Sequence, residues 1–242
     1  MSDVAIVMTT WFPAGDVGLQ RVHAATTATK SWLARLSGAT VRLHIADDAS
    51  HQGWLDKFRR PFPNASMTST PRLGTGGALN AGLRYVFEHD LAPVVAYVAD
   101  DWELTEPLDL APSLALLRDG VADVVRLGPT HPSLTGHVVR TASPGAEWCL
   151  EYDWMGGGYV FGHRPALHHR RLYDQHGYYI EGAAAIEVER EYNARLALSA
   201  TPPRVFHAPN CTLAGPFRHI DTVELGEDPP DVLTARYANG TP

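Results

Sequence analysis

The stretch VVAYVADDWE, residues 94–103, joins a run of apolar residues to a pair of acids. Its first five residues are apolar and rich in valine, which predicts a strand buried on both faces, as in a mostly parallel sheet. The run VAIVM, residues 4–8, has the same character, and VRLHIA, residues 41–46, alternates as a further strand before a second acidic pair. Because the carboxyl ends of parallel strands meet at one edge of a sheet, we expect both acidic pairs to lie at that edge.

Helical patterns separate these strands. Residues 19–36 carry apolar side chains at helical spacing, and Gly38 supplies a stop signal. A second helix is expected over about residues 77–88, before Pro93 restarts the chain. The alternation of strands and helices predicts an α/β fold, with a mostly parallel, doubly wound central sheet flanked by helices.

The second half of the chain is less regular. We expect a helical piece at residues 114–117, strands at 121–127 and 159–162, and a long helix over about 182–198. No internal repeat or linker is apparent, so we predict a single domain over residues 1–242. Within it we expect a nucleotide-side half at about residues 1–125, a partner-side half at about residues 126–220 and a peripheral tail at about residues 221–242.

Composition excludes some classes of protein. The chain has 242 residues, 45% of them apolar, so it can bury a substantial core. Its formal net charge is −7 without a Lys/Arg block, which argues against sequence-independent binding of nucleic acid. No run approaches the roughly 18 apolar residues that a membrane span needs. Two cysteines without metal-ligand spacing, Cys149 and Cys211, favour a reduced, cytoplasmic protein.

The glycine-rich stretch RLGTGGALNAG, residues 72–82, has two interpretations. A dinucleotide fingerprint needs a third glycine, where this chain has Leu79, and a buried strand before it, where this chain has Pro71. That interpretation also leaves the pair Asp47-Asp48 unexplained. Two acidic pairs at strand ends suit ribose hydroxyls and a divalent cation, although aspartates also cap turns and helices.

Four motifs in order resemble a known family. VAIVMTTW, HIADDAS, RLGTGGALNAG and YVADDWEL are similar to the nucleotide-sugar half of GT-A-fold glycosyltransferases, especially the family-2-like group. The resemblance covers residues 3–105 well and residues 156–195 more loosely. It implies a single GT-A (Rossmann-like) domain that takes a nucleoside-diphosphate-sugar as donor.

The resemblance also implies a donor site. Thr9 and Trp11 would line the nucleoside pocket, and Asp47 or Asp48 would contact the base or ribose. The loop packed over the donor would contribute its polar side chains and two glycines that allow close approach of the backbone, namely Arg72, Gly76, Gly77 and Asn80.

A metal site follows from the same resemblance. Asp101 matches the last Asp of the family's D-x-D motif and would hold Mn²⁺ or Mg²⁺ on the donor diphosphate. The first Asp of that motif falls on Ala99, which leaves Asp100 as its candidate substitute. His219 is the candidate C-terminal metal ligand, with His207 as a competitor.

The resemblance also implies a catalytic base on the long helix near the C-terminal end. Glu187 and Glu189 flank its apolar stripe on opposite sides, so only one of them can face the cleft, and we prefer Glu187. The family places an Arg after this carboxylate, here Arg190 or Arg195. The alternative is a charged helix face stabilised by pairs such as Glu191 with Arg195.

These features predict a metal-dependent glycosyltransferase that moves a sugar to an acceptor hydroxyl with inversion. The acceptor could be a small molecule, a saccharide, a protein or a modified nucleic acid. The alternatives are a sugar-phosphate nucleotidyltransferase and a catalytically degenerate GT-A domain that serves as a binding module.

Overall fold

A computed structural model describes residues 2–128, 136–154, 162, 164–208 and 216–220 of the chain. A parallel four-stranded unit forms the first half of its central sheet. The strands are β1 (Val4–Thr10), β3 (Val41–Asp47), β4 (Ser66–Ser69) and β5 (Val94–Ala99). β1 pairs with β3 on one side and β5 on the other, and β3 pairs with β4, all in parallel. The apolar runs that predicted buried strands are β1 and β5, and their residues 4–8 and 94–98 are buried.

The sheet continues through strands of mixed direction. In the described residues its order is β4-β3-β1-β5-β11-β8-β12-β10-β9. β11 runs antiparallel to both of its neighbours, so the second half is mixed and the first half parallel. The added strands are β8 (Val124–Arg126), β9 (Gly136–Arg140), β10 (Trp148–Tyr152), β11 (Ala166–His169) and β12 (Val205–His207).

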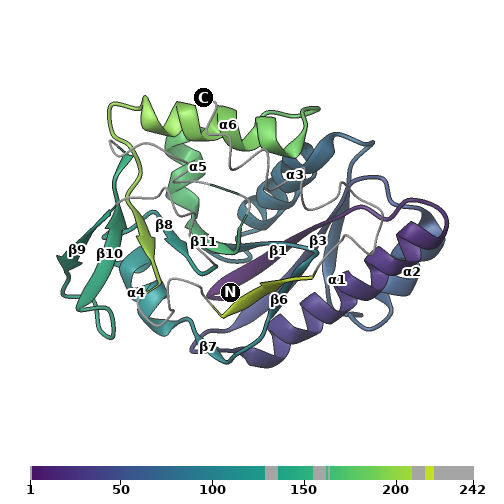
Figure 1. Ribbon diagram of the computed structural model, residues 1–242, viewed down its shortest axis with the longest axis horizontal. Helices are drawn as coiled ribbons and strands as arrows, with labels where there is room; N and C mark the ends of the chain where they lie inside the picture. The colour runs from purple at the N-terminus through teal and green to yellow at the C-terminus, as the bar shows by residue number, and fades with distance from the viewer. Residues whose placement is uncertain (1, 129–135, 155–161, 163, 209–215, 221–242) are drawn as a thin grey trace.

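Helices cover both faces of this sheet, as the sequence predicts (Figure 1). The helices are α1 (Asp16–Arg35), α2 (Gln52–Arg59), α3 (Gly74–Glu88), α4 (Ala111–Arg118), α5 (Arg170–His176) and α6 (Ala185–Ala197). Helices α1, α2 and α4 share one apolar core with alternate residues of the strands, and α3, α5 and α6 share the core on the other face. The expected α/β class, a mostly parallel sheet flanked by helices, is therefore confirmed.

Two short pairs of strands lie outside the central sheet. They are β2 (Leu36–Ser37) with β7 (Leu108–Asp109), and β6 (Trp102–Leu104) with β13 (Phe217–His219). The second pair matters for the site, because it brings His219 opposite Trp102, the residue that follows the acidic pair of β5.

Some boundaries differ from the sequence-based expectation. Helix α3 begins at Gly74, three residues earlier than expected, so its glycines belong to a helix and not to a loop. Strand β8 is shorter than the expected 121–127, and helices α2 and α5 were not expected. Most of the expected strand 159–162, and the whole of the expected tail 221–242, lie outside the described residues. Within the described residues, no helix is both long and apolar enough to cross a membrane.

Candidate functional site

The register of the parallel strands brings both acidic pairs to one edge of the sheet. Thr10 at the end of β1 is the register partner of Asp47 at the end of β3. On its other side, β1 places Thr9 opposite Ala99, the residue before Asp100 and Asp101. The pairs are separated by more than fifty residues in the chain, and pairing to the same strand makes them neighbours.

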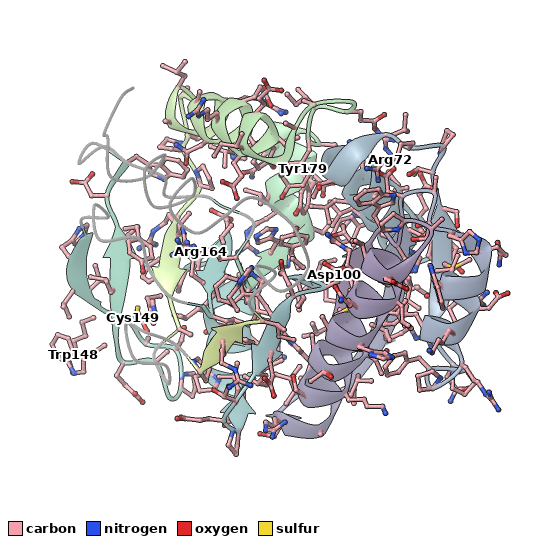
Figure 2. The ribbon with its side chains drawn as sticks, turned by 45° about the vertical axis from the view of Figure 1, so that its right-hand side comes forward. Arg72, Asp100, Trp148, Cys149, Arg164 and Tyr179 are labelled. Atoms are coloured by element: carbon pink, nitrogen blue, oxygen red, sulfur yellow. The ribbon has the colours of Figure 1, made fainter. Side chains whose placement is uncertain are left out.

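A pocket of about 490 Å³ opens at this edge. Of the sequence-predicted residues, Thr9, Trp11, Asp48, Arg72, Asp100 and Asp101 line it. The other walls come from helices on both faces, through Arg21 of α1, the first turn of α3 and residues 183–185 at the start of α6. Figure 2 labels Arg72 and Asp100, which mark two of its walls.

Two guanidinium groups lie near the ring of Trp11. The guanidinium carbon of Arg72 lies 3.7 Å from the ring centroid, and that of Arg21 lies 5.6 Å from it. Arg72 has a φ of 58°, a left-handed conformation that is unfavourable for a residue with a side chain and that clusters at functional sites. The pocket thus combines a flat aromatic surface with positive charge.

Asp48 holds the turn that carries Arg72. Its carboxylate accepts hydrogen bonds from the backbone N–H of Leu73 at 2.7 Å, from that of Gly74 at 3.0 Å and from the Thr70 hydroxyl at 2.8 Å. Arg72 adds an ion pair at 3.3 Å. Asp48 therefore fixes the N-terminal end of α3 while it lines the pocket.

Asp47 is buried behind the pocket wall. It accepts hydrogen bonds from the Thr10 hydroxyl at 3.2 Å and the Ser50 backbone N–H at 3.1 Å. Its contacts are those of a turn-capping aspartate, and it is not among the residues that line the pocket.

Asp100 and Asp101 have different partners. Both carboxylate oxygens of buried Asp100 lie 3.3 Å from Nη2 of Arg21. Asp101 Oδ2 lies 3.0 Å from Nε2 of His219, which β13 brings beside β6. The other oxygen, Asp101 Oδ1, is buried and has no hydrogen-bond partner in the described part of the chain.

The pair Asp101 and His219 fits a divalent metal ion that shares its coordination with a ligand. A bound cation would supply the partner that the buried Oδ1 of Asp101 lacks in the described part of the chain. Asp101 also lines the pocket, where a ligand could share such a cation. Within the described residues no group of three His, Cys, Asp or Glu could hold a metal. Mg²⁺ commonly takes only one or two carboxylates and completes its shell with phosphate oxygens and water.

Gly76, Gly77 and Asn80 face away from the pocket, contrary to their expected place over the donor. A Cβ on Gly76 would lie 2.1 Å from the Ile180 carbonyl oxygen, and one on Gly77 would lie 2.2 Å from Cβ of Leu73. These glycines therefore allow α3 to pack closely against the protein's own chain.

Asn80 is buried in the same junction. Its side chain donates to the Tyr179 carbonyl oxygen at 2.9 Å and accepts from the Tyr179 N–H at 3.0 Å. A further hydrogen bond reaches Glu181 Oε1 at 2.9 Å. Asn80 thus connects α3 to the segment that leads into residues 183–185 of the pocket wall.

The two candidate catalytic glutamates of α6 lie in different surroundings. Glu187 is exposed, and its Oε2 accepts a hydrogen bond from the Ala184 N–H at 3.2 Å, so it caps its own helix. Glu189 is half-buried, and a Cβ placed on Gly162 would lie 3.6 Å from its Oε1. Its charge also acts on Tyr97, which lines the pocket, and on Arg126. Glu189 is the one that faces the inside of the protein.

Other candidate residues have structural partners. Arg195 pairs with Glu191 at 2.6 Å, as the charged-helix interpretation expects. In the basic cluster at residues 168–171, Arg171 pairs with Asp123, and the cluster is not part of the pocket lining. His207, the competitor of His219, belongs to β12 and does not line the pocket either.

Arg21 is one of the lining residues that the sequence patterns do not identify. Nothing in the helical pattern of residues 19–36 distinguishes it from a solvent-exposed arginine. Only the packing of α1 against the sheet brings its guanidinium group to Asp100 and Trp11. The apolar neighbours of Tyr97 predict only a buried position in a strand. Its side chain is buried and also lines the pocket.

Comparison with known proteins establishes the fold. No family model and no curated protein sequence matches the chain. Among solved structures, residues 1–349 of S. aureus TarS align with a TM-score of 0.55 at 15% identity, over 86% of this chain and 58% of that one. A second TarS structure, with a TM-score of 0.53 at 15% identity, is a complex with UDP and aligns over 85% of this chain and 60% of that one.

Two further structures contain manganese. The mannosyltransferase PcManGT from Pyrobaculum calidifontis, in complex with GDP-Man and Mn²⁺, aligns with a TM-score of 0.52 at 15% identity, over 86% of this chain and 55% of that one. GalNAc-T7 with UDP, GalNAc and Mn²⁺ aligns with a TM-score of 0.53 at 12% identity, over 86% of this chain and 42% of that one. The chain has the GT-A fold, and it covers only 58% of the TarS chain of residues 1–349.

Proposed function

We propose that this GT-A chain is a glycosyltransferase that moves a sugar from a nucleoside-diphosphate-sugar to an acceptor hydroxyl. The observation that carries the proposal is the pocket at the carboxyl ends of β1, β3 and β5. It combines an aromatic surface, two arginines and an acidic pair at the edge where open α/β sheets bind their ligands. The solved structures with this fold that hold UDP or GDP-Man support a sugar nucleotide as the ligand.

The donor would lie with its nucleoside against Trp11. Thr9 and Asp48 line the same wall and offer hydrogen-bonding oxygens to the base or ribose. Arg72 and Arg21 bring positive charge toward the diphosphate.

Asp101 and His219 would hold a divalent metal ion, Mn²⁺ or Mg²⁺. Such an ion supplies Lewis-acid stabilisation of the negative charge on a departing diphosphate. Asp100 forms an ion pair with Arg21, so its role here is to position that arginine at the pocket wall.

Glu189 is the carboxylate best placed to act as general base. It is half-buried and its charge acts on Tyr97 of the pocket, whereas Glu187 is exposed and caps α6. A base at this position would remove the proton of an acceptor hydroxyl as that oxygen attacks the anomeric carbon. Attack from the side opposite the leaving diphosphate inverts the anomeric configuration. This assignment replaces Glu187, the preferred residue of the sequence analysis.

A thermal-shift series tests the proposal. UDP, GDP and their sugar conjugates, each with and without Mn²⁺, are added to the full chain, and a ligand that binds only the folded state raises Tm. We expect at least one sugar nucleotide to raise Tm, with a larger rise in Mn²⁺, and NAD to have no effect.

Two tryptophan variants provide a matched comparison. Trp11→Ala should remove the shift, because the ring that faces the nucleoside is lost. Trp148→Ala should retain it, because Trp148 is exposed on β10, away from the pocket. Absence of a shift with every nucleotide would contradict the proposal. Binding without sugar transfer to any acceptor would identify a binding module, and pyrophosphate release from a nucleoside triphosphate would identify a nucleotidyltransferase.

A further inference from the structure

Strand β9 forms one edge of the central sheet in the described residues, at the end of the molecule opposite α2 (Figure 1). An edge strand presents backbone N–H and C=O groups that can pair with another chain, and proteins usually protect such an edge with Pro, Lys or a bulge. The sequence of β9, GHVVR, has neither Pro nor Lys. Its pairing with β10 is continuous from residue 136 to residue 140, so no bulge interrupts it. This edge therefore lacks the usual protection.

The opposite edge of the sheet has a different character. It is β4, whose sequence SMTS is mostly polar. The hydroxyl groups of Ser66 and Thr68 form hydrogen bonds with the ring of His44 on the neighbouring strand. Met67 is partly buried against the apolar core. The features that favour pairing with another chain are therefore found at β9 and not at β4.

Exposed apolar side chains lie on one face of the hairpin that β9 forms with β10. Val138 is the register partner of Leu150, and two positions along the hairpin Arg140 is the partner of Trp148. All four side chains therefore point to the same face. Leu150 packs against the core that α3, α5 and α6 cover, whereas Val138 is 68% exposed and Trp148 63% exposed. The apolar surface of that core thus continues to the edge of the sheet and ends there in solvent. Figure 2 shows Trp148 at this end of the molecule.

The edge is complementary to a second copy of itself. Two β9 strands can pair antiparallel about a two-fold axis that is perpendicular to the sheet, which keeps each side chain on its own face. With the axis at Val138, that residue lies opposite Val138 of the partner subunit. Leu150 flanks Val138 in each copy, so the row across the joined sheets is apolar from one β10 to the other. Cross-strand pairs of this kind are what stabilises a sheet.

The charges at the edge are compatible with this register. Arg140 would lie opposite the partner's Gly136, which has no side chain to obstruct it. The guanidinium carbon of Arg140 lies 5.6 Å from the ring centroid of Trp148 in its own chain. His137 would lie opposite the partner's Val139. No two like charges are therefore placed opposite each other, an arrangement that would be destabilising.

The neighbouring registers are less favourable. Because side chains alternate between faces, the axis must pass through a residue, and the next choices are His137 and Val139. An axis at His137 places the two imidazole rings opposite each other. An axis at Val139 places Arg140 opposite the partner's Val138 and breaks the apolar row. The register centred on Val138 is the one that avoids both costs.

We propose that β9 pairs with β9 of a second copy of this chain, so that the two sheets join across a two-fold axis at Val138. Such an interface uses the same surface on both copies and closes at the dimer. Main-chain hydrogen bonds supply affinity, and the alternate side chains supply the choice of partner. No described residue of β9 or β10 lines the donor pocket, so the inference does not depend on the proposed sugar transfer.

Analytical ultracentrifugation of the full chain over a wide range of protein concentration tests this inference. We expect an equilibrium between monomer and dimer, without larger species. Val138→Lys should raise the dimer Kd by at least about tenfold, because two ammonium groups would lie directly opposite each other. Val17→Lys, the same substitution at an exposed valine of α1, is the matched control and should leave Kd unchanged. Circular dichroism shows whether both variants are folded.

Cysteine cross-linking tests the register. In Val138→Cys the two Cβ atoms would be about 4.5–5.5 Å apart, close to their separation in a disulfide. In Arg140→Cys the two cysteines would be four residues out of register, about 14 Å apart. Mild oxidation should therefore yield a covalent dimer of Val138→Cys and not of Arg140→Cys. The wild type, which carries the same native Cys149 and Cys211, gives the background.

The outcomes decide the inference whatever the donor is. A dimer that Val138→Lys dissociates and that Val138→Cys cross-links would support it. A monomer at every concentration would overturn it and would mean that another protein or another part of the chain covers this edge. A dimer that Val138→Lys leaves intact, or one that only Arg140→Cys cross-links, would overturn it as well. Binding of UDP is measured separately and bears only on the proposed function.

Discussion

Asp100 and Asp101 are adjacent in the chain, yet their carboxylates serve different partners. Asp100 is bonded to Arg21 at 3.3 Å, and Asp101 lies 3.0 Å from His219. Successive residues after a strand point in different directions, so one of them faces helix α1 and the other faces β13. At the scale of single residues, this difference assigns the proposed metal contact to Asp101 and a positioning role to Asp100.

Replacing Asp101 by asparagine should remove the effect of Mn²⁺ on the donor. The variant keeps the size of the side chain but loses the charge that a hard cation requires. We expect the Mn²⁺-dependent increase in UDP affinity to fall by on the order of tenfold or more. Calorimetry with UDP, in Mn²⁺ and in EDTA, measures this difference.

His219→Ala should reduce the same increase, because His219 is the second proposed ligand. An Asp101→Asn variant that keeps the full Mn²⁺ effect would contradict the metal assignment.

Replacing Glu189 by glutamine should lower kcat and leave donor binding unchanged. An amide cannot accept the acceptor proton, and loss of a general base reduces the rate by about 10²–10⁴-fold. Steady-state kinetics with a sugar nucleotide and an acceptor measures kcat, and calorimetry measures UDP affinity.

Glu187→Gln is the matched control on the same helix. Its amide oxygen can still accept a hydrogen bond from the Ala184 N–H, so the helix cap and the activity should both persist. If Glu187→Gln reduces kcat and Glu189→Gln does not, the roles of the two residues are reversed.

At the scale of elements, the junction of α3 with the segment before α6 shapes the pocket. Close packing at Gly76 and the hydrogen bonds of Asn80 hold α3 against residues 179–181. The next residues of that segment, 183–185, form a wall of the pocket. Residues that never touch a ligand therefore define its shape.

Asn80→Ala should destabilise the protein by about 2–4 kcal/mol. It removes the hydrogen bonds that the Asn80 side chain makes with the buried N–H and carbonyl of Tyr179, and each lost bond to a buried group costs about 1–3 kcal/mol. Urea denaturation measures the free energy of unfolding. The exposed Asn64→Ala is the matched control and should stay close to the wild type. An Asn80→Ala variant of unchanged stability that binds UDP weakly would instead support a direct donor contact.

At the scale of the whole molecule, buried histidines make the free energy of unfolding depend on pH. His44 on β3 is fully buried between strand and helix, with its ring nitrogens 2.9 Å from the Ser66 hydroxyl and 3.1 Å from the Thr68 hydroxyl. Burial is the main reason that its pKa falls from 6.5 to about 4, and the nearby His89 contributes. Burial lowers the pKa of His169, His176 and His207 in the same direction.

Acidification should therefore weaken the fold before the carboxylates titrate. Above pH 6.5 His44 is neutral in both the folded and the unfolded chain, whereas between pH 6.5 and about 4 only the unfolded chain takes up the proton. This one histidine should lower the free energy of unfolding by about 2 kcal/mol between pH 7.5 and pH 5. Urea denaturation at the two values of pH measures the loss.

His44→Gln can keep both hydrogen bonds without titrating, and its pH dependence should be smaller. Equal pH dependence in the variant and the wild type would exclude His44 as the source.

Local patterns in the amino-acid sequence are enough to predict the alternating strands and helices of the first half and the edge of the sheet at which the site lies. An apolar run such as residues 4–8 or 94–98 is buried in a globular protein, so its burial can be predicted from the run itself. The acidic pairs follow such runs directly, and parallel strands can only present their carboxyl ends at one edge. Thr9, Trp11, Asp48, Arg72, Asp100 and Asp101 could therefore be placed at the pocket from the sequence and the resemblance that it carries.

The tertiary structure alone decided which side chains meet. The ion pair of Arg21 with Asp100 joins residues 79 positions apart, and the hydrogen bonds of Asn80 to Tyr179 join residues 99 positions apart. The choice of Glu189 over Glu187 depends on how α6 is rotated over the sheet, and the alignment of Tyr97, Ala166 and Arg126 depends on the register of β5, β11 and β8. Contacts of this kind arise from packing and strand register, which depend on the whole chain at once and leave no pattern in any local stretch of sequence.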